Sequence, residues 1–352
     1  MSIARIMMQA AVGVGTGPKT LAVAHNTTPF ITAYAWSADG FGVKFSDPAT
    51  LPAGTGNGVA FTPDGDAIAV AHETTPFITA YPWSGSGFGS KYSDPATLPL
   101  VLGKCVAFNP AGTAIAVGQE ISPFITAYPW SGSGFGTKYS GPASVPVGAG
   151  QGISWNPDGT VIAVAHNGLP PDAANNNISA YPWSGSGFGT KYSNPATPPV
   201  GTGHDVAFSP DGTAIAIGCE QSPFVSTYPW SGSGFGTKYS NPGVLPASTG
   251  KGVAFTPDGN AIAVAHSATP FVSAYPWSSS GFGSKYSDPA TLPAGNGNDV
   301  AFSSDGSAIA VAHTTTPFIT AYPWSSSGFG TKYSNPGVLP ANIGNDVAWS
   351  NV

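Results

Sequence analysis

The chain repeats one unit of about 47 residues seven times, and this repeat constrains the fold more than any other feature. A Tyr-Pro-Trp-Ser motif, with Ala in place of Pro in the first unit, marks each copy by its tryptophan: Trp36, Trp83, Trp130, Trp183, Trp230, Trp277 and Trp324. Successive tryptophans are 47 residues apart, except that Trp130 and Trp183 are 53 apart. A period of this length is typical of a solenoid, a propeller or an array.

Each unit predicts four β-strands. In the second unit, two apolar runs at 59–61 and 67–72 flank Asp64-Gly65, a tight hairpin signal. A third strand is expected at 77–81, which is rich in β-branched and aromatic residues, and a short fourth strand within 87–93. Sustained apolar spacing of three and four residues is missing, and the sequence holds 47 Gly and 35 Pro, so we expect almost no helix.

The apolar pattern predicts sheets that are buried on both faces. In the second strand, Ile68 and Val70 share one face while Ala69 and Ala71 share the other. Large residues on one sheet can therefore meet small residues on the next, as sheets stacked around an axis require. Pro82 lacks the N–H that a ladder needs, so we expect the third strand to stop pairing at Tyr81 or to bulge there.

The motif Phe-Ser-Pro-Asp-Gly-Thr at 208–213, a strand of small residues and a strand ending in Trp resemble WD40-type and YVTN-type β-propeller repeats. The resemblance covers about residues 20–352 and implies an all-β fold, a seven-bladed β-propeller of four-stranded antiparallel blades. Trp-Ser replaces Trp-Asp, and the Gly-His dipeptide before the first strand is absent. The hydrogen-bonded tetrad of WD40 repeats is therefore not expected.

The two ends of the sequence predict how the ring closes. Residues 346–351 match the first strand of a unit well, whereas residues 10–18 match it poorly. We expect the C-terminal strand to complete the first blade, which removes open edges. The predicted division is an N-terminal arm at 1–19 and a propeller at 20–352. The apolar arm residues Ile3, Ile6, Met7 and Met8 are expected to pack on the propeller or to dock onto a partner.

The composition of the chain limits the classes of partner that we expect it to bind. The net charge is −6 and the pI about 5.3, which disfavours nucleic acid. Only 8% of residues are charged, a composition that suits an extracellular or particle-bound protein. A run of ~18 apolar residues is missing, so no membrane span is expected. Cys105 and Cys219 occupy different positions in their units, which indicates small buried residues rather than a disulfide.

One position just before the first strand of each unit is polar in all seven copies. These residues should ring one mouth of the axial channel: Asn57, Lys104, Gln151, His204, Lys251, Asn298 and Asn345. The loops between second and third strands should share that face, and three of them carry Glu73, Glu120 and Glu220. Convergent polar groups at a concave mouth predict a binding site. The alternative is that they cap strand ends and meet water. An insertion at about 167–176 in the fourth unit is either functional or tolerated drift.

Two further sets recur at fixed positions. Seven lysines on the outer strand either bind an anionic polymer or blunt the strand edge: Lys44, Lys91, Lys138, Lys191, Lys238, Lys285 and Lys332. Five histidines lie one per unit, too far apart in a sevenfold ring to share a metal: His25, His72, His166, His266 and His313. We therefore expect structural hydrogen bonds there, and neither a metal nor a cofactor.

Known catalytic motifs are missing, including HExxH, CxxC, GxSxG and the P-loop. The expected function is therefore a non-enzymatic structural or interaction propeller, a subunit of a larger assembly such as a virion or tail component, with protein partners or further copies of itself. One alternative is a glycan-binding lectin that uses the repeated Trp and Tyr side chains as stacking platforms. Another is an enzyme whose site lies on the loops at the channel mouth, with His204 and Glu220 as its candidates.

Overall fold

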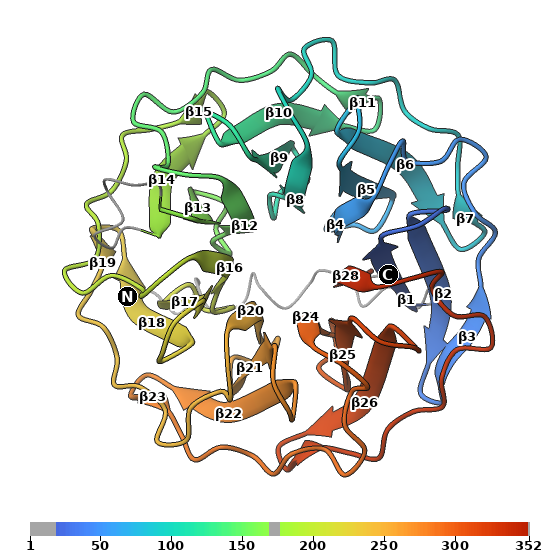
Figure 1. Cartoon of the computed structure of the whole chain (residues 1–352). Coiled ribbons are helices and arrows are strands. Elements are labelled where there is room, and N and C mark those ends of the chain that lie inside the picture. The colour runs from blue at the N-terminus through green and yellow to red at the C-terminus, as the bar shows by residue number, and fades with distance from the viewer. Residues whose placement is uncertain (1–18, 169–176, 351–352) are drawn as a thin grey trace, which may run out of the picture.

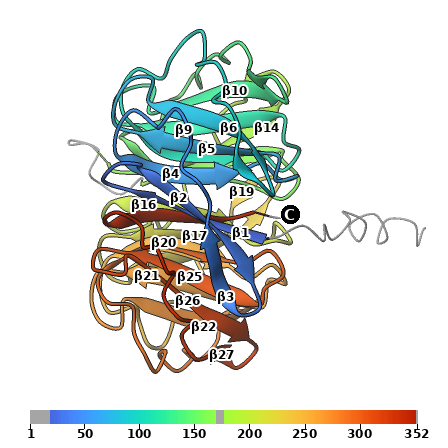
Figure 2. The ribbon, with the colours of Figure 1, turned by 90° about the vertical axis from the view of Figure 1, so that its right-hand side faces the viewer.

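The computed structural model describes residues 19–168 and 177–350, which form seven four-stranded antiparallel sheets around one axis (Figure 1). Seen from the side, the ring of sheets is a thick disc (Figure 2). Within the described ranges every regular element is a strand, so none of them is a helix that could cross a membrane. The predicted seven-bladed β-propeller is confirmed.

Each blade runs from an inner strand at the axis to an outer strand at the rim. The inner strands are β4 (Gly56–Phe61), β8 (Gly103–Phe108), β12 (Gly150–Trp155), β16 (Gly203–Phe208), β20 (Gly250–Phe255), β24 (Gly297–Phe302) and β28 (Gly344–Trp349). The second strands are β1 (Lys19–His25), β5 (Ala67–His72), β9 (Ala114–Gln119), β13 (Val161–His166), β17 (Ala214–Cys219), β21 (Ala261–His266) and β25 (Ala308–His313).

The third strands are β2 (Ile31–Ser37), β6 (Ile78–Ser84), β10 (Ile125–Ser131), β14 (Ile178–Ser184), β18 (Val225–Ser231), β22 (Val272–Ser278) and β26 (Ile319–Ser325). The outer strands are β3 (Gly40–Lys44), β7 (Gly87–Phe88), β11 (Gly134–Phe135), β15 (Gly187–Phe188), β19 (Gly234–Phe235), β23 (Gly281–Phe282) and β27 (Gly328–Phe329). We number the blades from blade 1 (β28, β1, β2, β3) to blade 7 (β24–β27).

The C-terminal strand closes the ring, as predicted. β28 pairs antiparallel with β1, with Leu21 opposite Trp349 and Val23 opposite Val347, and supplies the inner strand of blade 1. The hydroxyl of Tyr34 donates to the carbonyl of Val338 at 2.8 Å, which also ties the connection leaving blade 7 to blade 1. The first and last described strands are therefore held in one sheet, and the ring has no open seam.

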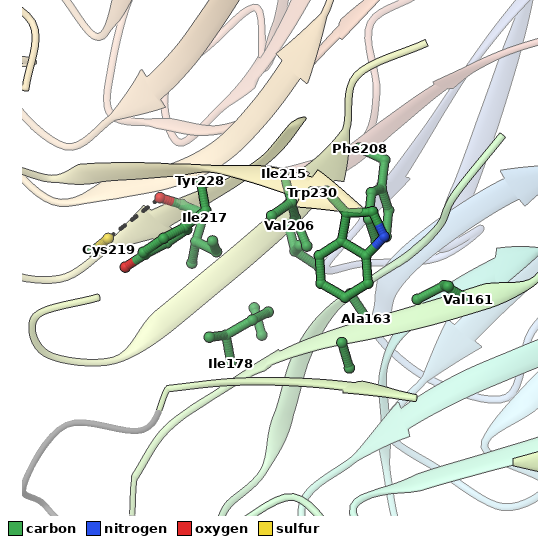
Figure 3. Close-up of a cluster of buried hydrophobic side chains, with 12 residues drawn as sticks. Val161, Ala163, Ile178, Val206, Phe208, Ile215, Ile217, Cys219, Tyr228 and Trp230 are labelled. Atoms are coloured by element: carbon green, nitrogen blue, oxygen red, sulfur yellow. Dashed lines mark hydrogen bonds between the residues drawn. The ribbon is translucent and has the colours of Figure 1, made fainter. Parts of the chain in front are cut away.

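The core lies between neighbouring blades. In the cluster between blades 4 and 5, the large side chains Tyr228 and Trp230 of β18 face the small Ala163 of β13, with Ile178 beside them (Figure 3). The repeated tryptophans are at most 9% exposed and make edge-to-face contacts, such as Trp230 with Phe235 at 4.9 Å between ring centroids. This large-to-small packing is what the alternation of residues predicted.

The proline of the repeated motif acts on one side of its strand only. Our expectation that pairing stops or bulges at Tyr81 is wrong for the inner side, where Pro82 pairs with Ala67 and β6 continues to Ser84. The carbonyl of Pro82 accepts from the Gly89 N–H at 2.8 Å, on the outer side. Since the amide nitrogen and carbonyl of one strand residue face the same way, the missing N–H affects only the outer strand. β7 is accordingly two residues long.

Candidate functional site

A β-bulge in every inner strand builds the candidate site. The extra residue of each bulge is the polar residue singled out in the sequence, for example Asn57 between Gly56 and Gly58, or His204 between Gly203 and Asp205. A bulge re-aims a side chain out of the regular alternation. The structure places all seven bulge residues around one axial cavity of about 440 Å³: Asn57, Lys104, Gln151, His204, Lys251, Asn298 and Asn345.

The glycine before each bulge is required by a close backbone contact. A Cβ on Gly103 would lie 2.5 Å from the carbonyl oxygen of Phe77 in the preceding blade, and one on Gly203 would similarly meet the carbonyl oxygen of Asn177. The same carbonyls accept hydrogen bonds from the second strands, as Phe77 does from the His72 N–H at 3.0 Å. Glycine therefore lets the bulge approach the loop of the neighbouring blade, which fixes its height in the channel.

Three asparagines of the ring have structural partners. The side-chain amides of Asn57, Asn298 and Asn345 each donate to a glycine carbonyl of the next blade, at 2.9, 2.9 and 2.8 Å. These bonds cross-link the blades at the mouth and match the alternative that these residues cap strand ends. The four bulge residues on consecutive blades 3 to 6 form an arc of longer side chains that can contact a ligand: Lys104, Gln151, His204 and Lys251.

The sequence reasoning missed a second set of residues, one position after the bulge. Asp205, Asp299, Asp346 and Cys105 also line the cavity. Each aspartate accepts the backbone N–H of an inner-strand valine in the next blade, as Asp205 Oδ2 does from Val253 at 2.9 Å. The equivalent residue is Gly58, Gly152 or Gly252 in the other units. This contrast between glycine and a functional side chain at one repeat position could have revealed them.

Burial makes these carboxyl groups weak acids. It raises the pKa of Asp205 to about 7, although two backbone N–H groups favour its charged form. Burial also raises the pKa of Asp346, and that of Asp299 even more, since Asp299 meets the negative charge of Asp346 and hydrogen-bonds to it. Asp299 and Asp346 therefore titrate as a pair. Since the pKa of Asp205 is about 7, its carboxyl can give or accept a proton at neutral pH.

His204 is the one imidazole in the cavity lining. Burial lowers its pKa, and the positive charge of Lys251 acts in the same direction, whereas Glu220 opposes them. The neutral imidazole is therefore the form present at pH 7, and it can accept a proton. Glu73, Glu120 and Glu220 are exposed and lie outside the cavity lining, and of the three Glu220 lies near enough to His204 to act on its pKa. Glu220 accepts the Thr202 N–H at 3.2 Å, and this bond lowers its pKa.

The repeated histidines and lysines have local partners. The five histidines are fully buried, and each Nε2 bonds a Thr or Ser hydroxyl of the next strand, as His72 does with Thr79 at 2.8 Å. On the rim, Lys44, Lys91 and Lys285 pair with the aspartate three residues further on. The histidines therefore make the structural hydrogen bonds that were expected. Cys219 is buried, Cys105 is half-buried, and both are free thiols.

Two expectations fall on residues outside the described ranges: the arm residues Ile3, Ile6, Met7 and Met8, and most of the insertion at 167–176. The lectin alternative loses its main support, because all seven motif tryptophans are buried between blades and offer no open face for a sugar ring to stack on.

Similarity to known proteins is structural. No protein-family model matches the chain, and no curated protein sequence matches it. A candidate 6-phosphogluconolactonase from Bacteroides uniformis is 14% identical over 94% of this chain and 99% of its own, with a TM-score of 0.71. Another from Bacteroides fragilis is 12% identical, with coverage of 95% and 98% and a TM-score of 0.69. A periplasmic gluconolactonase from Pseudomonas aeruginosa is 16% identical, with coverage of 94% and 99% and a TM-score of 0.66.

These findings bear on two expectations. The resemblance to WD40 and YVTN repeats is confirmed for the seven-bladed architecture, and membership of either family stays a prediction, since no family model matches. The expected non-enzymatic structural or virion propeller is contradicted, because solved propellers that share nearly the whole fold are named as lactonases. The error arose from treating missing linear motifs as evidence against catalysis, although one fold hosts many functions.

Proposed function

We propose that this protein is a hydrolase that opens the lactone ring of a small sugar acid in the axial cavity. The observation that carries the proposal is that Lys104, Gln151, His204 and Lys251 line the same cavity as the buried carboxyl of Asp205. Three solved propellers of similar fold support the same class, since they are named as a gluconolactonase and as candidate 6-phosphogluconolactonases.

The size and polarity of the cavity suit this substrate class. A volume of about 440 Å³ lies within the range of small-molecule sites, about 300–1,000 Å³. Its lining offers amide groups at Asn57 and Gln151, which can hydrogen-bond sugar hydroxyls. Lys104 and Lys251 supply two positive charges on either side of Gln151 and His204, which favours a substrate or product that carries a negative charge.

The chemistry needs three groups. Lactone hydrolysis adds one water: a C–O bond forms between the water oxygen and the carbonyl carbon, and the ring C–O bond breaks. In our proposal neutral His204 takes the proton from the attacking water, and the Lys251 ammonium stabilises the negative charge that develops on the carbonyl oxygen. Asp205, with its pKa near 7, gives a proton to the departing ring oxygen. The product is the open-chain hydroxy acid.

The test is lactone hydrolysis by the purified protein, measured above the spontaneous rate with glucono-δ-lactone and its 6-phosphate. His204→Gln and Lys251→Met are each expected to lower kcat/KM about 100-fold or more. The first variant removes the general base, and the second removes the positive charge that stabilises the carbonyl oxygen. Lys138→Met on the outer rim is the matched control and should leave the rate unchanged. A wild-type protein no faster than buffer on either lactone, or unchanged turnover in His204→Gln, would overturn the proposal.

A further inference from the structure

The bulge asparagine of blade 7, Asn298, contacts the bulge lysine of blade 6, Lys251. Lys251 Nζ donates to Asn298 Oδ1 at 3.5 Å, and Asn298 Nδ2 donates to the carbonyl of Gly344 at 2.9 Å. The three residues lie on β20, β24 and β28, which are consecutive inner strands around the axis (Figure 1). The amide group of Asn298 thus has its donor on blade 1 and its acceptor on blade 6.

The equivalent residue of blade 2 shows what is particular to Asn298. Asn57 donates to the carbonyl of Gly103 at 2.9 Å, so its amide is anchored in the same way. The bulge residue of the blade before it is Asn345, which is uncharged. Asn298 is the one asparagine of the ring that follows a lysine, and its oxygen therefore meets an ammonium group.

This contact holds the ammonium without neutralising it. Within the described ranges the ion pairs involve Lys44, Lys91 and Lys285 on the rim, and no carboxylate pairs with Lys251. An amide oxygen attracts a cation through its dipole and leaves the full positive charge in place. A lysine side chain is otherwise flexible, with a large rotamer entropy. A charge that is already held in position needs no reorganisation when negative charge develops on a substrate.

The second lysine of the cavity lacks this partner. Lys104 is followed in the ring by Gln151, and no hydrogen bond joins its ammonium to another residue that the structure describes. Both lysines line the cavity, but only Lys251 is anchored by its neighbour. Lys251 is therefore suited to act at one fixed point, whereas Lys104 can adapt its position to a charged group of the substrate.

We propose that Asn298 is a positioning residue, whose side-chain oxygen holds the Lys251 ammonium where negative charge develops on the carbonyl oxygen of the lactone. The effect on turnover rests on the hydrolase function proposed above, but the contact can be tested without it. Burial lowers the pKa of His204, the positive charge of Lys251 lowers it further, and Glu220 opposes both. The pKa of His204 therefore reports where Lys251 is held, with or without a substrate.

The first test follows the pKa of His204 by NMR titration of the full chain, with His204→Gln to identify its signal. In Asn298→Ala we expect the pKa to rise towards its usual value, because a mobile ammonium is better screened by water. The matched control is Asn57→Ala, which also loses a bond to a glycine carbonyl but has no lysine in the blade before it; the pKa should stay as in the wild type. An unchanged pKa in Asn298→Ala, or the same rise in both variants, would overturn the proposal.

The second test is a double-mutant cycle on lactone turnover. Asn298→Ala is expected to lower kcat about tenfold, as the misplacement of a catalytic group does, with a smaller change in KM. In the Lys251→Met background it should lower kcat no further, because the residue acts through that lysine. An equal loss in both backgrounds would contradict the positioning role. If the wild type hydrolyses no lactone, the hydrolase proposal fails, whereas the NMR comparison still decides whether Asn298 holds Lys251.

Discussion

At the scale of single residues, the five buried histidines make the stability of the fold depend on pH. His25, His72, His266 and His313 have similar surroundings, and burial lowers the pKa of each to about 4. The same holds for His166. The unfolded chain binds protons at these sites near pH 6.5, whereas the folded chain does not. Their neutral state is therefore stable above pH 6.5, and the fold loses stability as the pH falls from 6.5 towards 4.

One variant isolates this effect. Gln119 naturally occupies the histidine position in blade 3 and accepts a hydrogen bond from Thr126, so His72→Gln should fold. The variant takes up one proton fewer than the wild type when it unfolds at acid pH. We therefore expect the difference in unfolding free energy between the two proteins to shift by about 1.2 kcal/mol per pH unit near pH 5, in favour of the variant as the pH falls. Denaturant unfolding at pH 7, 6 and 5 measures it. Parallel curves for the two proteins would contradict the assigned neutral histidine.

The comparison with a variant is needed because the axial carboxyls act in the opposite direction. The raised pKa of Asp205, about 7, and the raised pKa of Asp299 mean that the folded state binds protons more tightly than the unfolded state. Their contribution is fully present below the unfolded pKa of about 4 and is lost as the pH rises through the folded value. The pH dependence of the wild-type unfolding free energy therefore combines two opposite contributions. The difference in unfolding free energy between His72→Gln and the wild type contains only that of the histidine.

The candidate site was partly predictable at this scale. The bulge residues were found because they are polar in all seven units, and the ring geometry then brought them together. Asp205, Asp299 and Asp346 were not found, since each stands beside a bulge residue and looks like one more polar loop residue. What distinguishes them is burial, which sets the pKa of a carboxyl and depends on the neighbouring blade.

At the scale of the element, the inner strand with its bulge is the functional unit. Its geometry depends on the glycine before the bulge, because a Cβ on Gly103 would lie 2.5 Å from the carbonyl oxygen of Phe77. A backbone carbonyl that is itself hydrogen-bonded to β5 cannot move aside without losing that bond. The bulge thus couples the mouth of the channel to the loop of the neighbouring blade.

Gly103→Ala is therefore expected to destabilise the protein by about 3 kcal/mol, as overpacking against a fixed neighbour does. Gly132→Ala in the same blade is the matched control. A Cβ there meets nothing within 4 Å, so its effect should stay within about 0.5 kcal/mol. Urea unfolding of the two variants gives the comparison. Equal stability of Gly103→Ala and Gly132→Ala would show that the close carbonyl contact is not what fixes the bulge.

The elements themselves followed from local sequence rules. The Asp-Gly turns, the apolar second strand and the aromatic third strand all form where the pattern predicted them. The outer strands are short, as expected, because the N–H that Pro82 lacks would have faced them. Only blade 1, with Ala35, keeps a long outer strand. A single repeat position on the third strand thus decides the length of the outer strand beside it.

At the scale of the whole molecule, the closed ring creates the cavity. β28 completes blade 1 by pairing with β1, and it also brings Asn345 and Asp346 to the axis beside the inner strands of blades 2 and 7. Seven near-copies predicted this architecture, since each unit needs its neighbours to bury its faces. The function was not predictable in the same way, because the differences between the copies determine it. Those differences lie in two adjacent positions of the inner strand.

A crystal structure of the protein with an aldonic acid, the product class of lactone opening, tests the central claim most directly. We predict the acid in the axial cavity, with its carboxylate within hydrogen-bonding distance of Lys251 Nζ and one oxygen near His204, and no acid in the same soak of Lys251→Met. An empty axial cavity at saturating acid, or the acid bound only on the rim, would contradict the assignment of this chain's chemistry to the ring of bulge residues.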